Sequence, residues 1–278
     1  MTPLISHLLL APLLCLLLLA ACDGDGVGET DEAADGGDAF RIEGDLTVFA
    51  AASLTDAFGE MGSVLEANNP ELDIEFNFAS SNSLLTQIQE GAPADVYAAA
   101  APNPVDTAVE EGLVTTPEVF ALNVPVIVVP ADNPAGIESP ADLANGGVKL
   151  VLAAEDVPIG TYSRQVITNL SQDPEYGDDY DDAVLDNVVS NESDVRAVLA
   201  KVELGEADAG IVYISDAAVS GDKVRTIEFP EESNVIAEYP IAVVEDGDNG
   251  EAAAAFVEFV LSDVGQAILV EYGFQPAS

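Results

Sequence analysis

Basic residues are scarce in this 278-residue chain, which carries 7 Lys and Arg against 51 Asp and Glu, for a formal net charge of −44. Nucleic acid and acidic membrane surfaces bind proteins through clustered cations, so both are poor partners for this chain. Such acidity is typical of proteins from saline or alkaline habitats, and it is equally compatible with an ordinary acidic surface. Hydrophobic residues still make up 49% of the chain, which predicts a folded core.

Histidine, cysteine and tryptophan are almost absent, since the chain has one His, two Cys and no Trp. His7 and Cys15 lie in an apolar N-terminal run that indicates a signal peptide, because the run is short and is followed at once by Asp and Gly. Removal of residues 1–21 leaves one Cys and no His. Disulfides, His-based metal sites and Ser-His or Cys-His catalysis are then excluded in the mature chain.

The end of the signal peptide indicates where the protein is held. Residues 19–22, Leu-Ala-Ala-Cys, resemble the lipobox of bacterial lipoproteins, which predicts a lipid on Cys22 and an extracytoplasmic, membrane-anchored protein. A secreted protein cut near the same place is the alternative. Residues 22–43 are rich in Gly, Asp and Glu, and we expect them to form a disordered acidic tether.

Beyond the tether, apolar runs alternate with helical patterns. The expected strands are Leu46–Ala50, Ile74–Phe78, Ala94–Ala99, Val124–Val129, Lys149–Ala153, Ala209–Tyr213 and Tyr239–Val244. Strands separated by helices predict an α/β fold with mostly parallel sheets flanked by helices. The acidic run Asp178–Asp182 lacks the Gly turn and terminal Glu of a calcium loop, so a solvated acidic loop is the better interpretation.

Four turns lead into predicted helices, at Ser53, at Ser81, at residues 157–163 and at residues 193–196. A single Ser before a helix is usually an N-cap, and Ser53 with Asp56 three residues later matches a capping box. Four helix N-termini together can aim N–H groups and hydroxyls at an oxyanion without any Lys or Arg. Arg196 either pairs with a carboxylate of this site or, as we expect, braces the start of its helix.

Several sequence blocks appear in the order found in one family. They are residues 47–55 (Thr-Val-Phe-Ala-Ala-Ala-Ser-Leu-Thr), 78–81 (Phe-Ala-Ser-Ser), 91–96 (Gly-Ala-Pro-Ala-Asp-Val), 194–196 (Asp-Val-Arg), 210–217 (Gly-Ile-Val-Tyr-Ile-Ser-Asp-Ala), 229–231 (Phe-Pro-Glu), 239–244 (Tyr-Pro-Ile-Ala-Val-Val) and 272–274 (Tyr-Gly-Phe). Over residues 45–275 the chain thereby resembles the molybdate-binding protein of bacterial ABC importers.

The resemblance implies a ligand site of five residues: Ser53, Ser81, Ile159, Val195 and Tyr213. Ser and Tyr would donate through their hydroxyls, whereas Ile159 and Val195 would donate through backbone N–H groups. Ile159 stands where the family often has Ala, which matters little for a backbone donor. The molybdenum would be held through its oxygens, with no direct protein–metal ligand and no other cofactor.

The chemistry of the ligand agrees with this donor set. Molybdate at neutral pH is a fully deprotonated tetrahedral dianion, so its oxygens accept hydrogen bonds and donate none. Each hydrogen bond to a charged partner contributes about 1.5–3 kcal/mol, and half a dozen together can reach nanomolar affinity. A cation is therefore unnecessary, which reconciles an acidic protein with an anionic ligand.

The expected architecture is the two-lobed, type II periplasmic-binding-protein fold, closing by a hinge motion. Lobe 1 would take residues 44–123 and 241–278, and lobe 2 would take residues 124–240. The strands Val124–Val129 and Tyr239–Val244 would form the hinge. Two of the five site residues would come from lobe 1 and three from lobe 2.

The expected function is capture of molybdate and tungstate by a monomer that delivers them to an ABC permease and its ATPase. Sulfate or another tetrahedral oxyanion is the nearest alternative, because its charge and shape match. A membrane-tethered oxyanion sensor or adhesion module is a second alternative. We expect no enzyme activity, since nucleophile systems based on His or Cys are missing and no Gly-x-Ser-x-Gly elbow is present.

Overall fold

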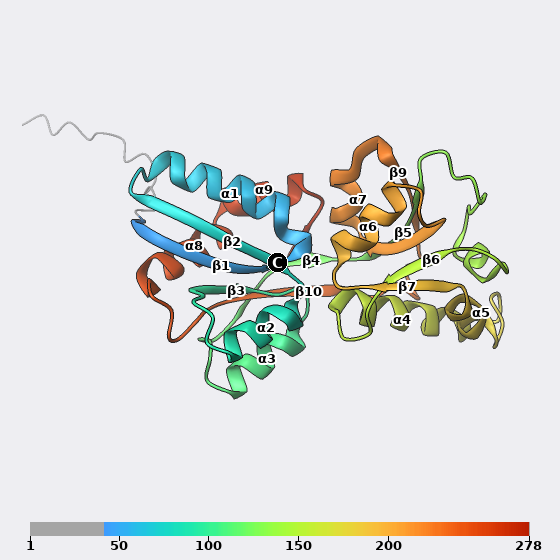
Figure 1. Ribbon diagram of the computed structural model, residues 1–278, viewed down its shortest axis with the longest axis horizontal. Coiled ribbons are helices and arrows are strands. Elements are labelled where there is room, and N and C mark those ends of the chain that lie inside the picture. The colour runs from blue at the N-terminus through green and yellow to red at the C-terminus, as the bar shows by residue number, and fades with distance from the viewer. Residues whose placement is uncertain (1–41, 278) are drawn as a thin grey trace, which may run out of the picture. The chain divides into compact units, whose positions relative to one another are not determined.

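The chain after residue 43 folds into two β-sheets flanked by helices, in a computed structural model that describes residues 42–277 (Figure 1). The first sheet has the order β11-β4-β10-β3-β1-β2. Its strands are β1 (Gly44–Ala51), β2 (Leu72–Ala79), β3 (Val96–Ala98), β4 (Glu118–Asn123), β10 (Ala237–Val243) and β11 (Gln275–Pro276). Its helices are α1 (Thr55–Asn68), α2 (Ser81–Gln89), α3 (Pro102–Glu110), α8 (Gly250–Leu261) and α9 (Asp263–Glu271), with the 3-10 helix η1 (Ala52–Leu54) before α1. We call this set the first lobe.

The second sheet has the order β7-β6-β8-β5-β9. Its strands are β5 (Pro125–Pro130), β6 (Leu150–Ala153), β7 (Val188–Glu192), β8 (Ala209–Tyr213) and β9 (Val224–Glu228). Its helices are α4 (Pro158–Ser171), α5 (Tyr180–Asp186), α6 (Val195–Glu203) and α7 (Ile214–Ser220), with 3-10 helices η2 (Pro140–Ala144) and η3 (Gly221–Lys223). We call this set the second lobe.

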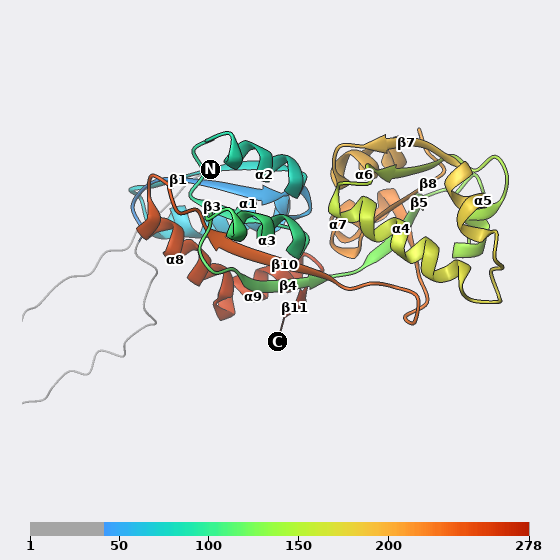
Figure 2. The same ribbon diagram turned by 90° about the horizontal axis from the view of Figure 1, so that it is seen from below.

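Strand β1 is central to the first lobe because both of its faces are buried. Val48 and Ala50 pack into the core beneath α1 and α8, whereas Phe49 packs into a separate core beneath α2 and α3. Phe58 of α1 meets Phe256 of α8 edge-on, with ring centroids 5.6 Å apart. The alternation of side chains along a strand thus places helices on both faces of the sheet, as Figure 2 shows.

Both sheets are mixed, which corrects the expectation of mostly parallel sheets. Strands β1, β2 and β3 run parallel to one another, as do β6, β7 and β8. Every antiparallel strand pair within residues 42–277 includes β4, β5 or β10. These strands adjoin the two places where the chain crosses between lobes, and a strand arriving from the other lobe need not follow the direction set by the βαβ units.

The two crossings lie at different positions along the chain. The first is Val124, between β4 and β5, and the second is the segment between β9 and β10. The expected lobe boundary at residue 240 falls inside β10, all of which belongs to the first sheet. Tyr239 lies opposite Ala121 of β4 in the ladder.

The predicted signal peptide 1–21, the lipidation of Cys22 and nearly all of the tether 22–43 lie outside the described residues. Within residues 42–277, no single helix is both long and apolar enough to cross a bilayer. The pair α8 and α9 reaches that length and composition only together, with a bend of 63° between them.

Candidate functional site

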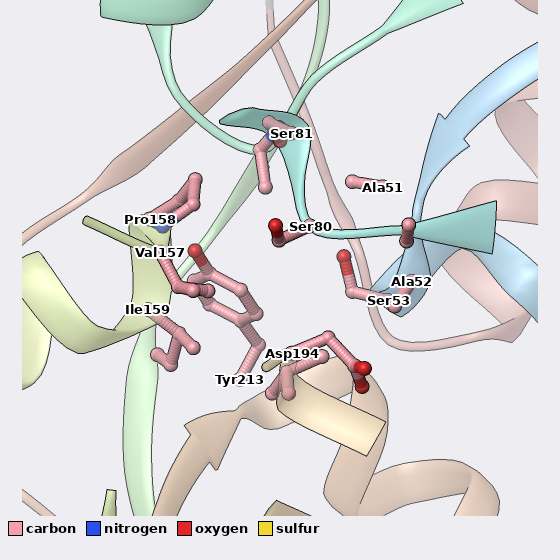
Figure 3. A pocket seen from close by; sticks show the side chains of 13 residues that line it. Ala51, Ala52, Ser53, Ser80, Ser81, Val157, Pro158, Ile159, Asp194 and Tyr213 are labelled. Atoms are coloured by element: carbon pink, nitrogen blue, oxygen red, sulfur yellow. The ribbon is translucent and has the colours of Figure 1, made fainter. Parts of the chain in front are cut away.

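A small cavity lies between the two lobes, where turns of the first lobe face helix starts of the second (Figure 3). The cavity volume is about 20 Å³. All five residues predicted from the sequence line it: Ser53, Ser81, Ile159, Val195 and Tyr213. The structure therefore brings together residues that the sequence separates by as many as 160 positions, counted from 53 to 213.

Ser53 is buried in the 3-10 turn η1, directly after β1. Its Oγ lies 3.0 Å from the hydroxyl oxygen of Tyr239. The prediction that Ser53 caps the first helix is wrong, because α1 begins at Thr55 and its N-cap, Leu54, makes no side-chain capping bond. The extra 3-10 turn moves the helix start past Ser53, which leaves the hydroxyl at the cavity.

Ser81 is the first residue of α2, and its neighbour Ser80 is the N-cap. The Ser80 hydroxyl accepts from the backbone N–H of Ser83, so capping does not occupy Ser81. The backbone N–H of Ala100 donates to Ser81 Oγ at 3.0 Å. That bond fixes the oxygen and leaves the hydroxyl hydrogen of Ser81 for another acceptor.

Helix α4 presents its first N–H groups to the cavity at Ile159. Pro158 occupies the first helical position and has no N–H, so Ile159 carries the first donor of the helix. The segment 157–163, predicted to be a turn, is therefore mostly helical, because α4 begins at Pro158. Gly160 permits the close approach, because a Cβ there would lie 1.9 Å from the carbonyl oxygen of Ala154.

Helix α6 presents Val195 as its first residue, after the N-cap Asp194. The Asp194 carboxylate accepts a hydrogen bond from the backbone N–H of Ala197 at 3.0 Å, so this carboxylate stays at the N-terminus of α6. Figure 3 shows this carboxylate pointing away from the Tyr213 hydroxyl. The backbone N–H of Val195 has no partner within its own helix, because the first N–H groups of any helix lack one.

Tyr213 ends β8, and its buried hydroxyl makes no hydrogen bond of good geometry within the described part of the chain, although the Tyr239 hydroxyl lies close to it. Its ring packs edge-on against Tyr239 and Tyr162, with centroids 5.7 and 6.5 Å away. Burial raises the pKa of Tyr213 well above its ordinary value, and the adjacent tyrosines and Asp216 raise it further, so the hydroxyl keeps its hydrogen. A buried hydroxyl without a partner costs about 1–3 kcal/mol, which an oxyanion acceptor would offset.

Arg196 follows the cavity residue Val195, and carboxylates from both lobes neutralise it. Its Nε lies 2.8 Å from Asp216 of α7, and its Nη2 lies 2.6 Å from Asp56 of α1. Nη2 also approaches the carbonyl oxygen of Ser53 at 3.5 Å. The expectation that Asp56 completes a capping box with Ser53 is therefore wrong, and Arg196 pairs with carboxylates rather than simply bracing its own helix.

Asp216 is fully buried and also accepts the backbone N–H of Tyr213 at 3.3 Å. Burial raises the pKa of Asp216 to about 7, while Arg196 opposes that shift. Arg196 is ion-paired with Asp56 and Asp216. The hydrogen-bond donors that remain around the cavity are therefore neutral hydroxyls and backbone N–H groups.

No group of three or more His, Cys, Asp or Glu within residues 42–277 is arranged to hold a metal ion. The acidic run 178–182 is only partly a loop, because α5 begins at Tyr180 and has Asp181 and Asp182 in its first turn. Acidic side chains there complement the positive end of the helix dipole.

Sequence reasoning missed the capping Ser80, which lines the cavity, and Tyr239 and Asn123, which lie behind it. Tyr239 stood in the sequence only as part of a predicted strand, and nothing in its surroundings signals contact with Ser53, 186 positions away. Ser80 could have been found, because a Ser directly before Ser-Asn-Ser-Leu is as good an N-cap candidate as Ser81.

Comparison with known proteins agrees with this geometry. Residues 46–275 match the family of bacterial extracellular solute-binding proteins. The molybdate-binding protein ModA of Mycobacterium tuberculosis H37Rv is 39% identical over 232 residues, which are 82% of this chain and 84% of that protein. The chain therefore belongs to the bacterial extracellular solute-binding proteins, in one family with proteins named ModA.

Solved structures show the same fold. The periplasmic molybdate-binding protein of Azotobacter vinelandii matches with a TM-score of 0.73 and 16% identity, over 84% of this chain and all (100%) of that chain. The sulfate-binding protein SubI of Mycobacterium tuberculosis H37Rv matches with a TM-score of 0.74 and 19% identity, over 84% of this chain and 87% of that chain. Both likenesses support the two-lobed periplasmic-binding-protein fold. The family binds solutes, which is not an enzymatic role.

Proposed function

We propose that this protein captures molybdate, and tungstate with it, in the cavity between its lobes. The observation that carries the proposal is the buried Tyr213 hydroxyl, which lines the cavity and makes no hydrogen bond of good geometry among the described residues. Two Ser hydroxyls and the starts of α4 and α6 converge on the same space. A fully deprotonated tetrahedral dianion satisfies such donors, because it accepts at every oxygen. The ModA relatives support this ligand over other anions of the same shape.

The five residues Ser53, Ser81, Ile159, Val195 and Tyr213 are proposed as the ligand site. Charge-assisted hydrogen bonds contribute about 1.5–3 kcal/mol each, so five donors suffice to offset the cost of association. The small cavity favours a compact ion over a sugar or peptide. Sulfate is the second candidate, because the fold is shared with a sulfate-binding protein and the donor set suits any such dianion.

As the binding component of an importer, the protein would deliver its ligand to an ABC permease and its ATPase outside the cytoplasm. We propose that it acts as a monomer whose two lobes are hinged where the chain crosses between them, at Val124 and in the segment between β9 and β10. A lipid on Cys22 would hold it at the membrane. Replacing Cys22 with Ser should then release the protein from the membrane fraction and leave ligand affinity unchanged.

Calorimetric titration of purified residues 39–278 with molybdate, tungstate, sulfate and phosphate tests the proposal directly. We expect molybdate and tungstate to bind in the nanomolar range, near −12 kcal/mol, and sulfate and phosphate to bind far more weakly. Preference for sulfate would replace the proposed ligand with the second candidate. No binding of any of the four ions would overturn the oxyanion function itself.

A further inference from the structure

We propose that Tyr239 and Asn123 orient the Ser53 hydroxyl as a hydrogen-bond donor toward the cavity and so make the site selective for fully deprotonated oxyanions. The inference rests on the proposed oxyanion-binding function and deepens it. Tyr239 and Asn123 do not line the cavity themselves. They are positioning residues that would act through Ser53.

Tyr239 lies on β10 with its side chain fully buried. Its hydroxyl oxygen is 3.0 Å from Ser53 Oγ, and either oxygen could donate in that bond. The choice matters for the ligand, because a Ser53 that donates to Tyr239 would turn its lone pairs toward an anion. A Ser53 that accepts from Tyr239 keeps its own hydrogen for the cavity.

Asn123, at the end of β4, constrains the direction of this bond. Its Oδ1 accepts the backbone N–H of Val124 at 3.0 Å, which fixes the orientation of the amide. Its Nδ2 donates to Ser215 Oγ at 2.8 Å and to the Tyr239 hydroxyl at a longer 3.4 Å. The two amide hydrogens of Asn123 are thereby both used, and Tyr239 is an acceptor toward Asn123.

The single hydrogen of Tyr239 is then left for Ser53 Oγ. Burial raises the pKa of Tyr239 well above its ordinary value, and the nearby Asp216 raises it further, so this hydrogen stays in place. In the reverse orientation the Tyr239 hydrogen would have to turn toward the neighbouring Tyr213 hydroxyl, which makes no hydrogen bond of good geometry with Tyr239, so the bond to Ser53 is the better one. The Ser53 hydrogen is consequently left for the cavity, and Figure 3 shows the Ser53 hydroxyl among the side chains that line it.

This arrangement bears on selectivity between tetrahedral anions. A Ser53 oxygen already occupied by the Tyr239 hydrogen is a poor acceptor for a proton carried by the ligand. Molybdate and sulfate carry no such proton near neutral pH, whereas phosphate carries at least one. We call the chain of hydrogen bonds from Asn123 through Tyr239 to Ser53 the relay. The relay would therefore weaken the binding of phosphate relative to molybdate and sulfate, in addition to the effect of the missing cations at the site.

The test is a double-mutant cycle of Tyr239→Phe and Ser53→Ala, with affinities for molybdate, sulfate and phosphate measured by calorimetry. Tyr239→Phe removes one oxygen and keeps the ring packing against Phe120 and Phe274. We expect molybdate and sulfate affinities to fall by about tenfold each, and phosphate affinity to change by less than about twofold. In the Ser53→Ala background, Tyr239→Phe should change molybdate affinity by less than about twofold.

Tyr180→Phe is the matched control, because the Tyr180 hydroxyl is also buried and bonds the carbonyl oxygen of Pro140 in the second lobe. It should leave all three affinities unchanged. If Tyr239→Phe does not fold, Asn123→Ala removes the other end of the relay and should weaken molybdate and sulfate in the same pattern by about threefold.

Equal weakening of all three ions, or the same loss with and without Ser53, would overturn the relay and leave Tyr239 a packing residue. The proposal that molybdate is the ligand can be wrong even if the relay exists. If the unaltered chain prefers sulfate to molybdate, the same cycle run with sulfate and phosphate still decides whether the relay exists.

Discussion

The two lobes approach the cavity with different chemistry. The first lobe offers the side-chain hydroxyls of Ser53 and Ser81. Each hydroxyl oxygen is held in place by a hydrogen bond within the protein, to Tyr239 and to the N–H of Ala100 respectively. The second lobe offers mainly backbone N–H groups at the starts of α4 and α6, with Tyr213 as its one hydroxyl. Side-chain identity should therefore matter on the first lobe, whereas on the second lobe the backbone conformation should matter more than the side chain.

The largest effect should come from the first lobe. Replacing both Ser53 and Ser81 with Ala removes two charge-assisted hydrogen bonds, so we expect molybdate binding to weaken by about 3–6 kcal/mol. Neither residue is an N-cap, so the fold should tolerate both changes. Calorimetry measures the affinity, and thermal unfolding of the free protein serves as the control. A folded double variant with unchanged affinity would refute the site.

The second lobe can be tested by removing a backbone donor without disturbing its helix. Val195 is the first residue of α6, a position that favours Pro, and Asp194 before it is extended, as a residue preceding Pro should be. Val195→Pro deletes one N–H, and we expect binding to weaken by about 1.5–3 kcal/mol. Val195→Ala keeps the N–H and should change affinity by less than about 0.5 kcal/mol. Equal losses in the two variants would mean that the side chain, not the backbone, matters.

The contrast between the lobes also explains what the sequence could predict. The α/β class and the family are confirmed, because the strand-to-helix turns have local patterns and the family blocks run along nearly the whole chain. The helices that follow the turns at Ser81 and at residues 193–196 were predicted from the sequence, whereas Ser80, the cap of α2, was not. Residues such as Ile159 and Val195 act through the backbone, so their side chains carry no chemical signal, and only the resemblance pointed to them.

Other features were beyond local patterns. Strands β7 and β9 are partly exposed edge strands, so their apolar periodicity is weak. The contact between Ser53 and Tyr239 depends on β10 returning to the first sheet from the second lobe. The pairing of Arg196 with Asp56 joins residues 140 positions apart. Such contacts are set by the tertiary arrangement, which sequence periodicity does not encode.

Asp216 allows the second lobe to be tested by pH. Its pKa is raised in the folded protein from an ordinary value of 3.8 to about 7, mainly by burial. The folded state therefore binds the proton more tightly than the unfolded state, and Asp216 contributes stability below about pH 4 that is lost as the pH rises through about 7. We expect Asp216→Asn to flatten the fall of the unfolding free energy between pH 4 and 8, as followed by urea denaturation. If the unfolding free energy of the unaltered protein and of Asp216→Asn changes with pH in parallel, Asp216 does not carry this pH dependence.

The smallest effect should come from the ion pair that links the lobes. Asp56 of α1 meets Arg196 of α6 at 2.6 Å, but the Asp56 side chain is 41% exposed, so solvent and salt screen the pair. Asp56→Ala should reduce molybdate affinity by about 0.2–1 kcal/mol at low ionic strength, because closure of the two lobes loses one contact. The loss should vanish near 1 M salt, where the Debye length is about 3 Å. Glu60→Ala, one helical turn further along α1, is the matched control for removing one negative charge from the same helix. If Asp56→Ala and Glu60→Ala change the affinity equally, the effect is general repulsion of the anion, and the pair does not hold the lobes together.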